Sequence, residues 1–591
     1  MGAYDATLEQ ALDLFEGPWS WLADGLARGR YALWLGSAIS RRRLPDLGEL
    51  LRRLLGEFVR RRTAGDPACP FDRALGELLD LAGERGVDRA ADPRSWPQLD
   101  AVVDRLWTRY DEVLGTRLRT DDGTTVADFL ELPKLYGDPG MEPDADHRLI
   151  ALCLEEGVVS ELYSGNWDGL VEEAHRRIRG PRSVELQVVA RPEDLPDART
   201  GQPVLYKFHG CAVQALAEGD PGQLVATQRG LLGWLLLPEA EPLREAMGHA
   251  MRRSPAMFVG LSAQDVNLQG LFRRVASAGS VDRGDDLPRA VFAKPSLERP
   301  QMDVLETLHP DAYRVGLDPA ALEARAALPL FSQPFFGGFY LWLLLAKARA
   351  LLDLAREAGE PTGEGELRRR IEGELFHLRR ALCLRYDPVE PENRWERLAQ
   401  ELPEGLGRML GIFQDGEPPG SGAPYRFLTP CHLDRIPREW ALRREYFDRL
   451  MLVLALLALL ARERGWRLDL APAAEGCHAA LDDGHRRSQV FVLQSMGRAA
   501  ERLRFHHLGG AADPWTVIVY VEGSEPRIRR TAPSRGGLPG RRGTGISSSS
   551  PTEIWLTDAL ADPPFAVSTS SAAAAEALRR RLPPMGGAAP W

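Results

Sequence analysis

The first 320 residues alternate between short apolar runs and longer segments whose apolar positions recur at helical spacing. The apolar runs are five or six residues long, and each is typical of a buried strand. They lie at residues 31–35, 158–163, 184–189, 204–208, 257–261 and 289–293. Helix-like segments between them, such as residues 241–253, carry an apolar stripe. Strands that alternate with helices predict an α/β fold with a Rossmann-like, doubly wound parallel sheet over about residues 20–320.

Beyond residue 320 the pattern changes to long amphipathic helices, followed by a few short strands. The helices are expected at residues 335–358, 364–384 and 439–465, and the strands at 467–470, 489–493, 515–521 and 553–556. A Gly/Pro-rich stretch at 413–425 indicates a linker. The predicted domains are residues 1–320 with a helical insertion at about 47–152, a helical connector at 321–412, a linker at 413–427, and a smaller C-terminal α/β domain at 428–591.

Four of the predicted strands end in small or polar residues. The segments are Gly36-Ser37-Ala38-Ile39-Ser40, Ser164-Gly165-Asn166-Trp167-Asp168, His209-Gly210, and Gly260-Leu261-Ser262-Ala263-Gln264-Asp265. Ligands of open parallel sheets bind at the carboxyl ends of the strands, so these four ends can share one crevice.

The residue types at these ends suit cleavage at a ribose carbon. Asn166 has both a donor and an acceptor that can orient a water molecule or a ribose hydroxyl. Histidine is a common general base, so His209 can accept a proton. The turn at Gly36 can receive a pyrophosphate. No G-x-G-x-x-G follows the first strand, which argues against a hydride-transfer enzyme.

Each of these residues also has a purely structural interpretation. His209 can be a core histidine, Asn166 a helix cap, and Gly36 a tight turn. Ser262 and Asp265 can cap the helix that follows them, or they can bind sugar hydroxyls. Only the occurrence of all four segments in one chain favours the functional interpretation.

Composition and charge narrow the class of protein. With 591 residues, the chain is expected to form about two to four domains. A formal charge of −10 argues against a nucleic-acid clamp, although the arginines of 527–542 leave a local contact open. The six cysteines include no C-x-x-C pair, so no metal is expected. The N-terminus is no secretory signal, and the longest apolar run, 450–461, is too short for a membrane span. We therefore expect a cytoplasmic protein.

The four segments, in this order, resemble those of the sirtuin-like (silent information regulator type) NAD-consuming domain. They are most similar to its zinc-less bacterial branch, which is found in anti-phage defence effectors. The family pattern is G-A-G-x-S, a proline after a short spacer, T-x-N-x-D, H-G, and G-x-S with a nearby Asp. This chain has Ala38 at the second glycine, Ser164 at the threonine, and Pro45 at the proline.

The resemblance implies an NAD⁺ glycohydrolase that produces nicotinamide and ADP-ribose, with Asn166 and His209 as catalytic residues. NAD⁺ would be the substrate, bound by Gly36, Ser37, Ser40, Asp168, Gly260, Ser262 and Asp265. The cellular role it implies is NAD⁺ depletion in abortive infection. The C-terminal half would restrain the site and bind a regulatory protein or a phage-derived trigger. Relatives often form homo-oligomers, so that state is a further possibility.

Two alternatives stay open from the sequence. One is a sirtuin-type protein deacylase, although deacylases of that family carry a four-cysteine zinc ribbon and no C-x-x-C follows His209. The other is a non-catalytic module that binds NAD or ADP-ribose as a signal, an interpretation that Ala38 leaves possible.

Overall fold

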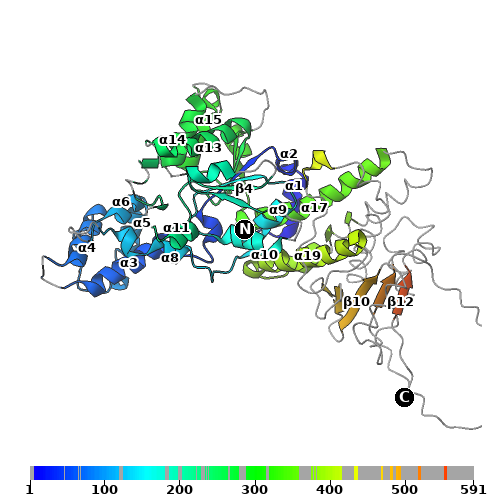
Figure 1. Ribbon diagram of the computed structural model, residues 1–591, viewed down its shortest axis with the longest axis horizontal. Coiled ribbons are helices and arrows are strands. Elements are labelled where there is room, and N and C mark those ends of the chain that lie inside the picture. The colour runs from blue at the N-terminus through cyan, green and yellow to red at the C-terminus, as the bar shows by residue number, and fades with distance from the viewer. Residues whose placement is uncertain are drawn as a thin grey trace, which may run out of the picture. The chain divides into compact units, whose positions relative to one another are not determined.

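A seven-stranded sheet, all of whose strands are parallel, forms the centre of the N-terminal part of the chain in the computed structural model (Figure 1). The structure describes residues 5–357 (except 46, 64–65, 67, 119–123, 180–184, 198–201, 221–222, 228–229, 231–232, 235, 237, 264–265, 278–287 and 315–317), 375–376, 379–380, 382–415, 431–436, 467–469, 479–482, 487–493, 517–520 and 552–555. The strands are β1 (Ala32–Leu35), β2 (Glu161–Ser164), β3 (Gln187–Val189), β4 (Val204–Lys207), β5 (Ala256–Val259), β6 (Ala290–Ala293) and β7 (Ala327–Leu328).

The strand order is β3-β4-β2-β1-β5-β6-β7, so β1 lies in the middle. Leu33 is in register with Leu162 of β2 on one side and with Met257 of β5 on the other. This arrangement confirms the predicted doubly wound α/β fold. Each of the six apolar runs forms a strand, while β7 lies beyond the region where strands were expected.

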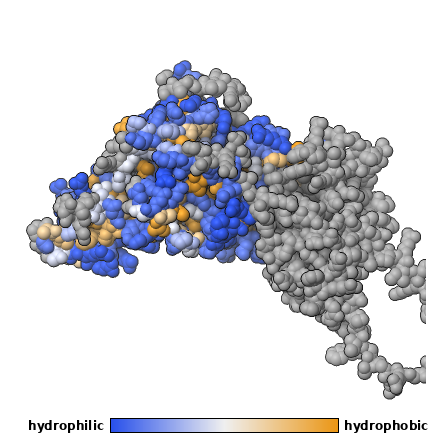
Figure 2. All heavy atoms as spheres, viewed as in Figure 1, coloured by the Kyte–Doolittle hydropathy of each residue, from blue (hydrophilic) through white to orange (hydrophobic). Residues whose placement is uncertain are grey.

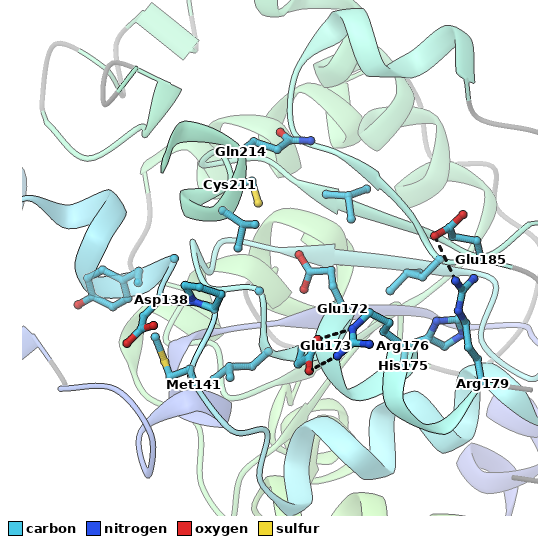
Figure 3. A pocket seen from close by; sticks show the side chains of 18 residues that line it. Asp138, Met141, Glu172, Glu173, His175, Arg176, Arg179, Glu185, Cys211 and Gln214 are labelled. Atoms are coloured by element: carbon cyan, nitrogen blue, oxygen red, sulfur yellow. Dashed lines mark hydrogen bonds and ion pairs between the residues drawn. The ribbon is translucent and has the colours of Figure 1, made fainter. Parts of the chain in front are cut away.

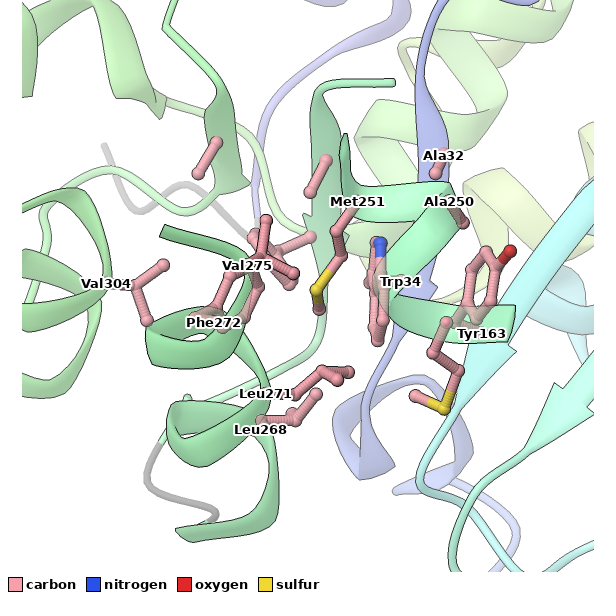
Figure 4. Close-up of a cluster of buried hydrophobic side chains, with 14 of the residues drawn as sticks. Ala32, Trp34, Tyr163, Ala250, Met251, Leu268, Leu271, Phe272, Val275 and Val304 are labelled. Carbon is pink, nitrogen blue, oxygen red and sulfur yellow. The ribbon is translucent and has the colours of Figure 1, made fainter. Parts of the chain in front are cut away.

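Aromatic residues on one face of the sheet form its core (Figure 4). The Trp34 ring stacks on Tyr163 with centroids 4.5 Å apart, and Phe258 stacks on Phe292 at 4.8 Å. Side chains on the same face of neighbouring strands come together because strand side chains alternate with period two. Phe272 from the following helix completes this layer. Burial of each such ring stabilises the fold by about 1.5–3 kcal/mol.

Helices pack on both faces of this sheet. Figure 1 shows α13 (Glu241–Arg253), α14 (Val266–Ser277) and α15 (Arg299–Leu308) on one face, with α9 (Ala145–Glu155) and α10 (Leu170–Ile178) on the other. Other helices of this region are α1 (Leu8–Glu16), α2 (Ser20–Ala27), α11 (Ala212–Glu218) and α16 (Ala320–Ala326). The break expected at Gly17-Pro18 separates α1 from α2.

Between β1 and β2 the chain forms a group of helices whose hydrophobic core also includes Ala212 and Ala215 of α11. They are α3 (Leu47–Arg61), α4 (Pro70–Leu81), α5 (Leu99–Trp107), α6 (Tyr110–Gly115), α7 (Val126–Phe129) and α8 (Leu132–Tyr136). Leu51, Leu54 and Phe58 of α3 pack against Leu75 and Leu78 of α4 in this core. Their outer sides are rich in charged residues, and Figure 2 shows hydrophilic residues over much of the coloured surface.

The chain divides into two compact units, one of Met1–Ala6 and Gln10–Tyr340, the other of Thr7–Glu9 and Leu341–Trp591. Helix α17 (Ser332–Glu357) crosses from the first unit into the second, which also contains α19 (Pro391–Asp415). The second unit has a five-stranded sheet in the order β12-β11-β10-β9-β8. Its strands are β8 (Arg467–Asp469), β9 (Ala479–Asp482), β10 (Arg487–Leu493), β11 (Val517–Tyr520) and β12 (Thr552–Trp555).

Four of these five strands lie at the positions expected from the sequence, and β9 is an additional one. The helix expected at 439–465 and most of that expected at 364–384 lie outside the described residues. The domain boundaries stay a prediction. The chain also forms short 3₁₀ helices: η1 (Ser37–Ser40), η2 (Pro93–Ser95), η3 (Pro192–Asp197), η5 (Pro238–Ala240), η6 (Pro310–Tyr313) and η7 (Leu433–Arg435).

Candidate active site

The candidate site lies at the carboxyl ends of the strands, at the switch point between β1 and β5. The chain leaves β1 for β2 on one side and later returns to the sheet at β5 on the other, which is where α/β proteins bind ligands. The Gly36 N–H donates to the Val259 carbonyl at 2.9 Å. A Cβ atom on Gly36 would lie 2.3 Å from the carbonyl oxygen of Gly260. Glycine is therefore required for the two strand ends to approach this closely.

The turn after Gly36 is the 3₁₀ helix η1. Its first residue, Ser37, is exposed, while Ser40 at its end is buried. The Ala38 N–H donates to the Gly260 carbonyl at 3.3 Å, and the Ala38 methyl lies 3.2 Å from where a Cβ of Gly260 would be. The methyl that replaces the family's second glycine therefore packs toward the β5 turn.

Asn166 is held beside β1 by its side chain and its backbone. Its Nδ2 donates to the Gly36 carbonyl at 3.2 Å, and its backbone N–H donates to Ser164 Oγ at 3.0 Å. The serine at this position thus supplies the hydroxyl that the family's threonine would carry. With 8% of its surface exposed, Asn166 is fixed at the strand end rather than free in solvent.

His209 follows β4 and lies next to Gly165, the neighbour of Asn166. A Cβ on Gly165 would be 3.4 Å from His209 Nδ1, and the imidazole packs edge-on to Phe208 with centroids 4.7 Å apart. Gly210 then turns the chain with a φ of +88°, where a Cβ would be 2.2 Å from the Gln223 carbonyl oxygen. The structure therefore brings the two predicted catalytic residues to adjacent strand ends, on either side of one glycine.

Behind this pair, a chain of buried hydrogen bonds links η1 to the loop after β2. Ser40 Oγ donates to Asp168 Oδ2 at 2.9 Å and lies 3.2 Å from His147 Nε2. His147 Nδ1 in turn lies 2.7 Å from Asp144 Oδ1. All four side chains are at least 95% buried, so Ser40 and Asp168 fix the geometry of the turn and the loop.

The charges in this network reinforce one another. Burial alone would lower the pKa of His147, but the hydrogen bond and the charge of Asp144 outweigh it and hold the pKa above its ordinary value. Burial would raise the pKa of Asp144, but its bond to His147 lowers it. Each group therefore favours the charged form of the other, and the second ring nitrogen of His147 reaches Ser40. At the neighbouring Asp146, burial and the Asp144 charge raise the pKa to about 7.

Lys207, the last residue of β4, supports the same loop from the other side. It is 1% exposed, and its ammonium donates to the Trp167 carbonyl at 3.2 Å, to the Asp168 carbonyl, and to Glu172 Oε1 at 2.9 Å. Burial would lower the pKa of Lys207, but the charge of Glu172 outweighs this effect and raises the pKa. The lysine is thus charged and anchors the segment that carries Asn166.

Sequence reasoning missed Asp144, His147 and Lys207 because their partners are distant in the chain. A weak signal existed for each of them. Asp144 stands before an apolar helical run as an N-cap, with His147 three residues later. Lys207 interrupts an otherwise apolar strand, where an unpaired charge would be costly.

The β5 turn supplies Gly260 and Ser262 to the same edge of the sheet. Ser262 is exposed, and its carbonyl accepts from Gln301 Nε2 at 3.0 Å. Asp265 lies outside the described residues. The roles predicted for the cofactor-binding residues, including Ser37 and Ser40, stay predictions.

Residues 160–308, about a quarter of the chain, match the family of SIR2-like domains. The chain thus carries a sirtuin-like domain, and the match supports an enzyme that uses NAD⁺. The matched region includes Asn166, His209 and Gly260 but begins after Gly36, which the sheet places beside them. No curated protein matches the chain.

Two further searches of the described residues concern membranes and metals. No described helix is both long and apolar enough to cross a bilayer. No group of three or more His, Cys, Asp or Glu side chains is arranged to hold a metal ion among the residues that the structure describes.

Proposed function

We propose that the protein is an NAD⁺ glycohydrolase that cleaves the bond between nicotinamide and ribose. The observation that carries the proposal is the placement of Asn166 and His209 at neighbouring strand ends, around Gly165 and beside the β1–β5 switch point. This site has a carboxamide, an imidazole and closely approaching glycine turns, which are the groups needed for a dinucleotide and an activated water molecule.

In the proposed reaction, the C1′–N bond breaks and its electron pair leaves with the nicotinamide nitrogen. The oxygen of a water molecule then bonds to C1′ of the oxocarbenium-like ribose, and ADP-ribose forms. Asn166, whose Nδ2 is engaged by the Gly36 carbonyl, orients the water through its Oδ1. His209 accepts the proton that the water loses and passes it to solvent. Preorganised dipoles at the strand ends stabilise the developing cation.

The test is incubation of the purified full-length chain with NAD⁺ alone, with nicotinamide and ADP-ribose measured. Asn166→Ala and His209→Ala are each expected to lower the rate at least about 100-fold, the usual effect of removing a positioned acid or base. The matched controls Asn393→Ala and His249→Ala change exposed residues of the same types and should retain full activity. Cleavage that requires an acylated peptide would instead indicate a deacylase, and bound but intact NAD⁺ a signalling module.

We further propose that this activity depletes NAD⁺ during phage infection, as an abortive defence regulated by the C-terminal half. The support is the likeness of the strand-end segments to those of the zinc-less bacterial branch. A sheet of its own in the second unit is consistent with a separate regulatory domain. Cells that express the protein should lose NAD⁺ after phage infection, and cells that express the His209→Ala variant should not. Equal NAD⁺ levels in both would argue against the defence role.

A further inference from the structure

Helix α17 begins beside α9, the helix whose first turn carries part of the buried network behind the candidate site. Asp146 on α9 and Gln333 on α17 are both buried. The Ser332 hydroxyl hydrogen-bonds to the Asp146 carboxyl group, and the Gln333 amide lies beside the same group. The Asp146 N–H also donates at 3.1 Å to Asp144 Oδ1, the oxygen that contacts His147. The first turn of α17 is therefore connected through Asp146 to the network that holds η1 and the loop after β2.

Two buried atoms at this junction lack hydrogen-bond partners. They are the acceptor Asp146 Oδ1 and the donor Gln333 Nε2, neither of which has a partner among the described residues. An unpaired buried polar atom is destabilising, so a small shift of α17 that joins this donor to this acceptor would gain free energy. The free energy at stake corresponds to about 5–150-fold in an equilibrium constant, the usual size of a coupling between two sites. The junction can thus adopt two arrangements, with and without this bond, and a ligand that favours one of them can shift the balance.

The first part of α17 packs tightly against α1. The rings of Phe335 and Phe339 on α17 contact Phe15 of α1, with centroids 6.1 and 6.2 Å apart. Gly338 brings the two helices so close that a Cβ atom on it would lie 2.6 Å from the Cβ of Ala11. Close-packed elements transmit a displacement instead of absorbing it, so α1 and the first part of α17 move together.

Helix α9, in contrast, is fixed within the first unit. Its Glu155 lies 2.9 Å from His175 of α10, and both side chains are at least 95% buried. Figure 3 shows His175 in the wall of a cavity beside α10. Helices α1 and α17 both extend into the second unit, which contains the start of α1 and the part of α17 after Tyr340. A change in the second unit therefore acts on α17, and α9 receives it at the junction.

We propose that α17 couples the second unit to the candidate NAD⁺ site, with the contact between Gln333 and Asp146 as the switch. A dinucleotide in the crevice fixes η1 and the loop after β2, and the buried network then holds Asp146 in the arrangement that pairs with Gln333. Because coupling between sites is reciprocal, a change in the second unit that moves α17 alters the affinity for NAD⁺. The inference rests on the proposed function, and its test separates the two.

Hydrogen exchange of the full-length chain with and without ADP-ribose, read by mass spectrometry, tests the coupling. ADP-ribose is the product of the proposed reaction, so it is not consumed during the measurement. We expect it to slow amide exchange at least about fivefold in residues 36–45 and in residues 332–357, the effect of one net hydrogen bond. Slowing in residues 36–45 alone would overturn the coupling and leave the proposed function standing, and slowing that ends at residue 340 would overturn the link to the second unit. No slowing in either segment would contradict the dinucleotide site itself, and the coupling with it.

Two variants locate the switch. Gln333→Leu removes the unpaired donor, and Ser332→Ala removes the hydroxyl that bonds to Asp146. In each variant ADP-ribose should still slow exchange in η1, but the slowing in α17 should fall below about twofold. The matched controls Gln98→Leu and Ser95→Ala change residues of the same types in the helical insertion and should respond as the parent chain does. Urea unfolding verifies that each variant is folded. Undiminished slowing of α17 in both variants would refute the proposal.

Discussion

Replacement of Lys207 by methionine should loosen the loop that carries Asn166. The methionine side chain is nearly as long as the lysine side chain, but it has no donor for the carbonyls of Trp167 and Asp168. It also leaves Glu172 without its buried cation. The substitution therefore removes the hydrogen bonds of the Lys207 ammonium while it keeps most of the packing of the side chain.

The size of the destabilisation by Lys207→Met follows from the burial of Lys207 and Glu172. Removal of one member of a buried ion pair costs about 3–5 kcal/mol, and the lower end applies here because Glu172 is 21% exposed and partly solvated. We expect the free energy of local opening to fall by about 3 kcal/mol, which corresponds to about 100-fold faster amide exchange. The double variant Lys207→Met/Glu172→Gln should lose less than the sum of the single variants, because both single changes break the same bond.

Hydrogen exchange read by mass spectrometry on peptides from residues 161–178 measures this effect directly. The matched control is Lys134→Met on α8, where the lysine is 64% exposed and pairs with Glu131. An exposed pair contributes at most about 1 kcal/mol, so the control should exchange as the parent chain does. If Lys207→Met exchanges no faster than Lys134→Met in this segment, the anchoring role of the buried ammonium is refuted.

Three further substitutions test the surroundings of the site. Asp146→Asn should not change the free energy of unfolding below about pH 4. As the pH rises to 7 it should stabilise the fold by up to about 4 kcal/mol, because the folded pKa of Asp146, about 7, exceeds the unfolded value. Urea unfolding at pH 5 and pH 8 measures the difference, and equal gains at both pH values would contradict this explanation. His147→Phe should cost about 3 kcal/mol or more in the same assay, because the buried carboxylate of Asp144 loses its imidazole partner and Ser40 loses a contact; an unchanged midpoint would refute the role of these contacts. Gly36→Ala should abolish NAD⁺ binding in calorimetry, because its Cβ would collide with the Gly260 backbone; retained affinity would show that the β1 turn is not part of the site.

The order of strands and helices could be predicted from the sequence because it depends on local patterns. Residues 204–208 form a run of the length and apolar character of a buried strand, and β4 occupies all but the last of them. Strand β7 has only two residues, Ala327 and Leu328, at the end of a helix. Two residues are too few to show the pattern of apolar positions by which a strand is recognised in a sequence.

The candidate site could be predicted only in outline. The proximity of Asn166 and His209 could be predicted because each follows a strand, and parallel strands direct their carboxyl ends to one edge of the sheet. The contact between Ser40 and His147 could not be found in this way, because it joins a turn after β1 to the first turn of α9 across the whole helical insertion. Such pairings depend on how helices pack onto the sheet.

The central position of β1 links the site to the folding of the entire first unit. The SIR2-like match begins at residue 160, yet the glycine turn that faces Asn166 is contributed by β1, and residues 36–160 intervene before β2 begins. The crevice can form only after β1 has paired with both β2 and β5, since Gly36 contacts Asn166 on one side and Gly260 on the other. Closure of so long a loop is entropically costly, and the packing of α3–α8 around a hydrophobic core reduces that cost by making the intervening chain compact. The helical insertion therefore contributes to the site without lining it, because its compact fold keeps β1 and β2 close enough to pair.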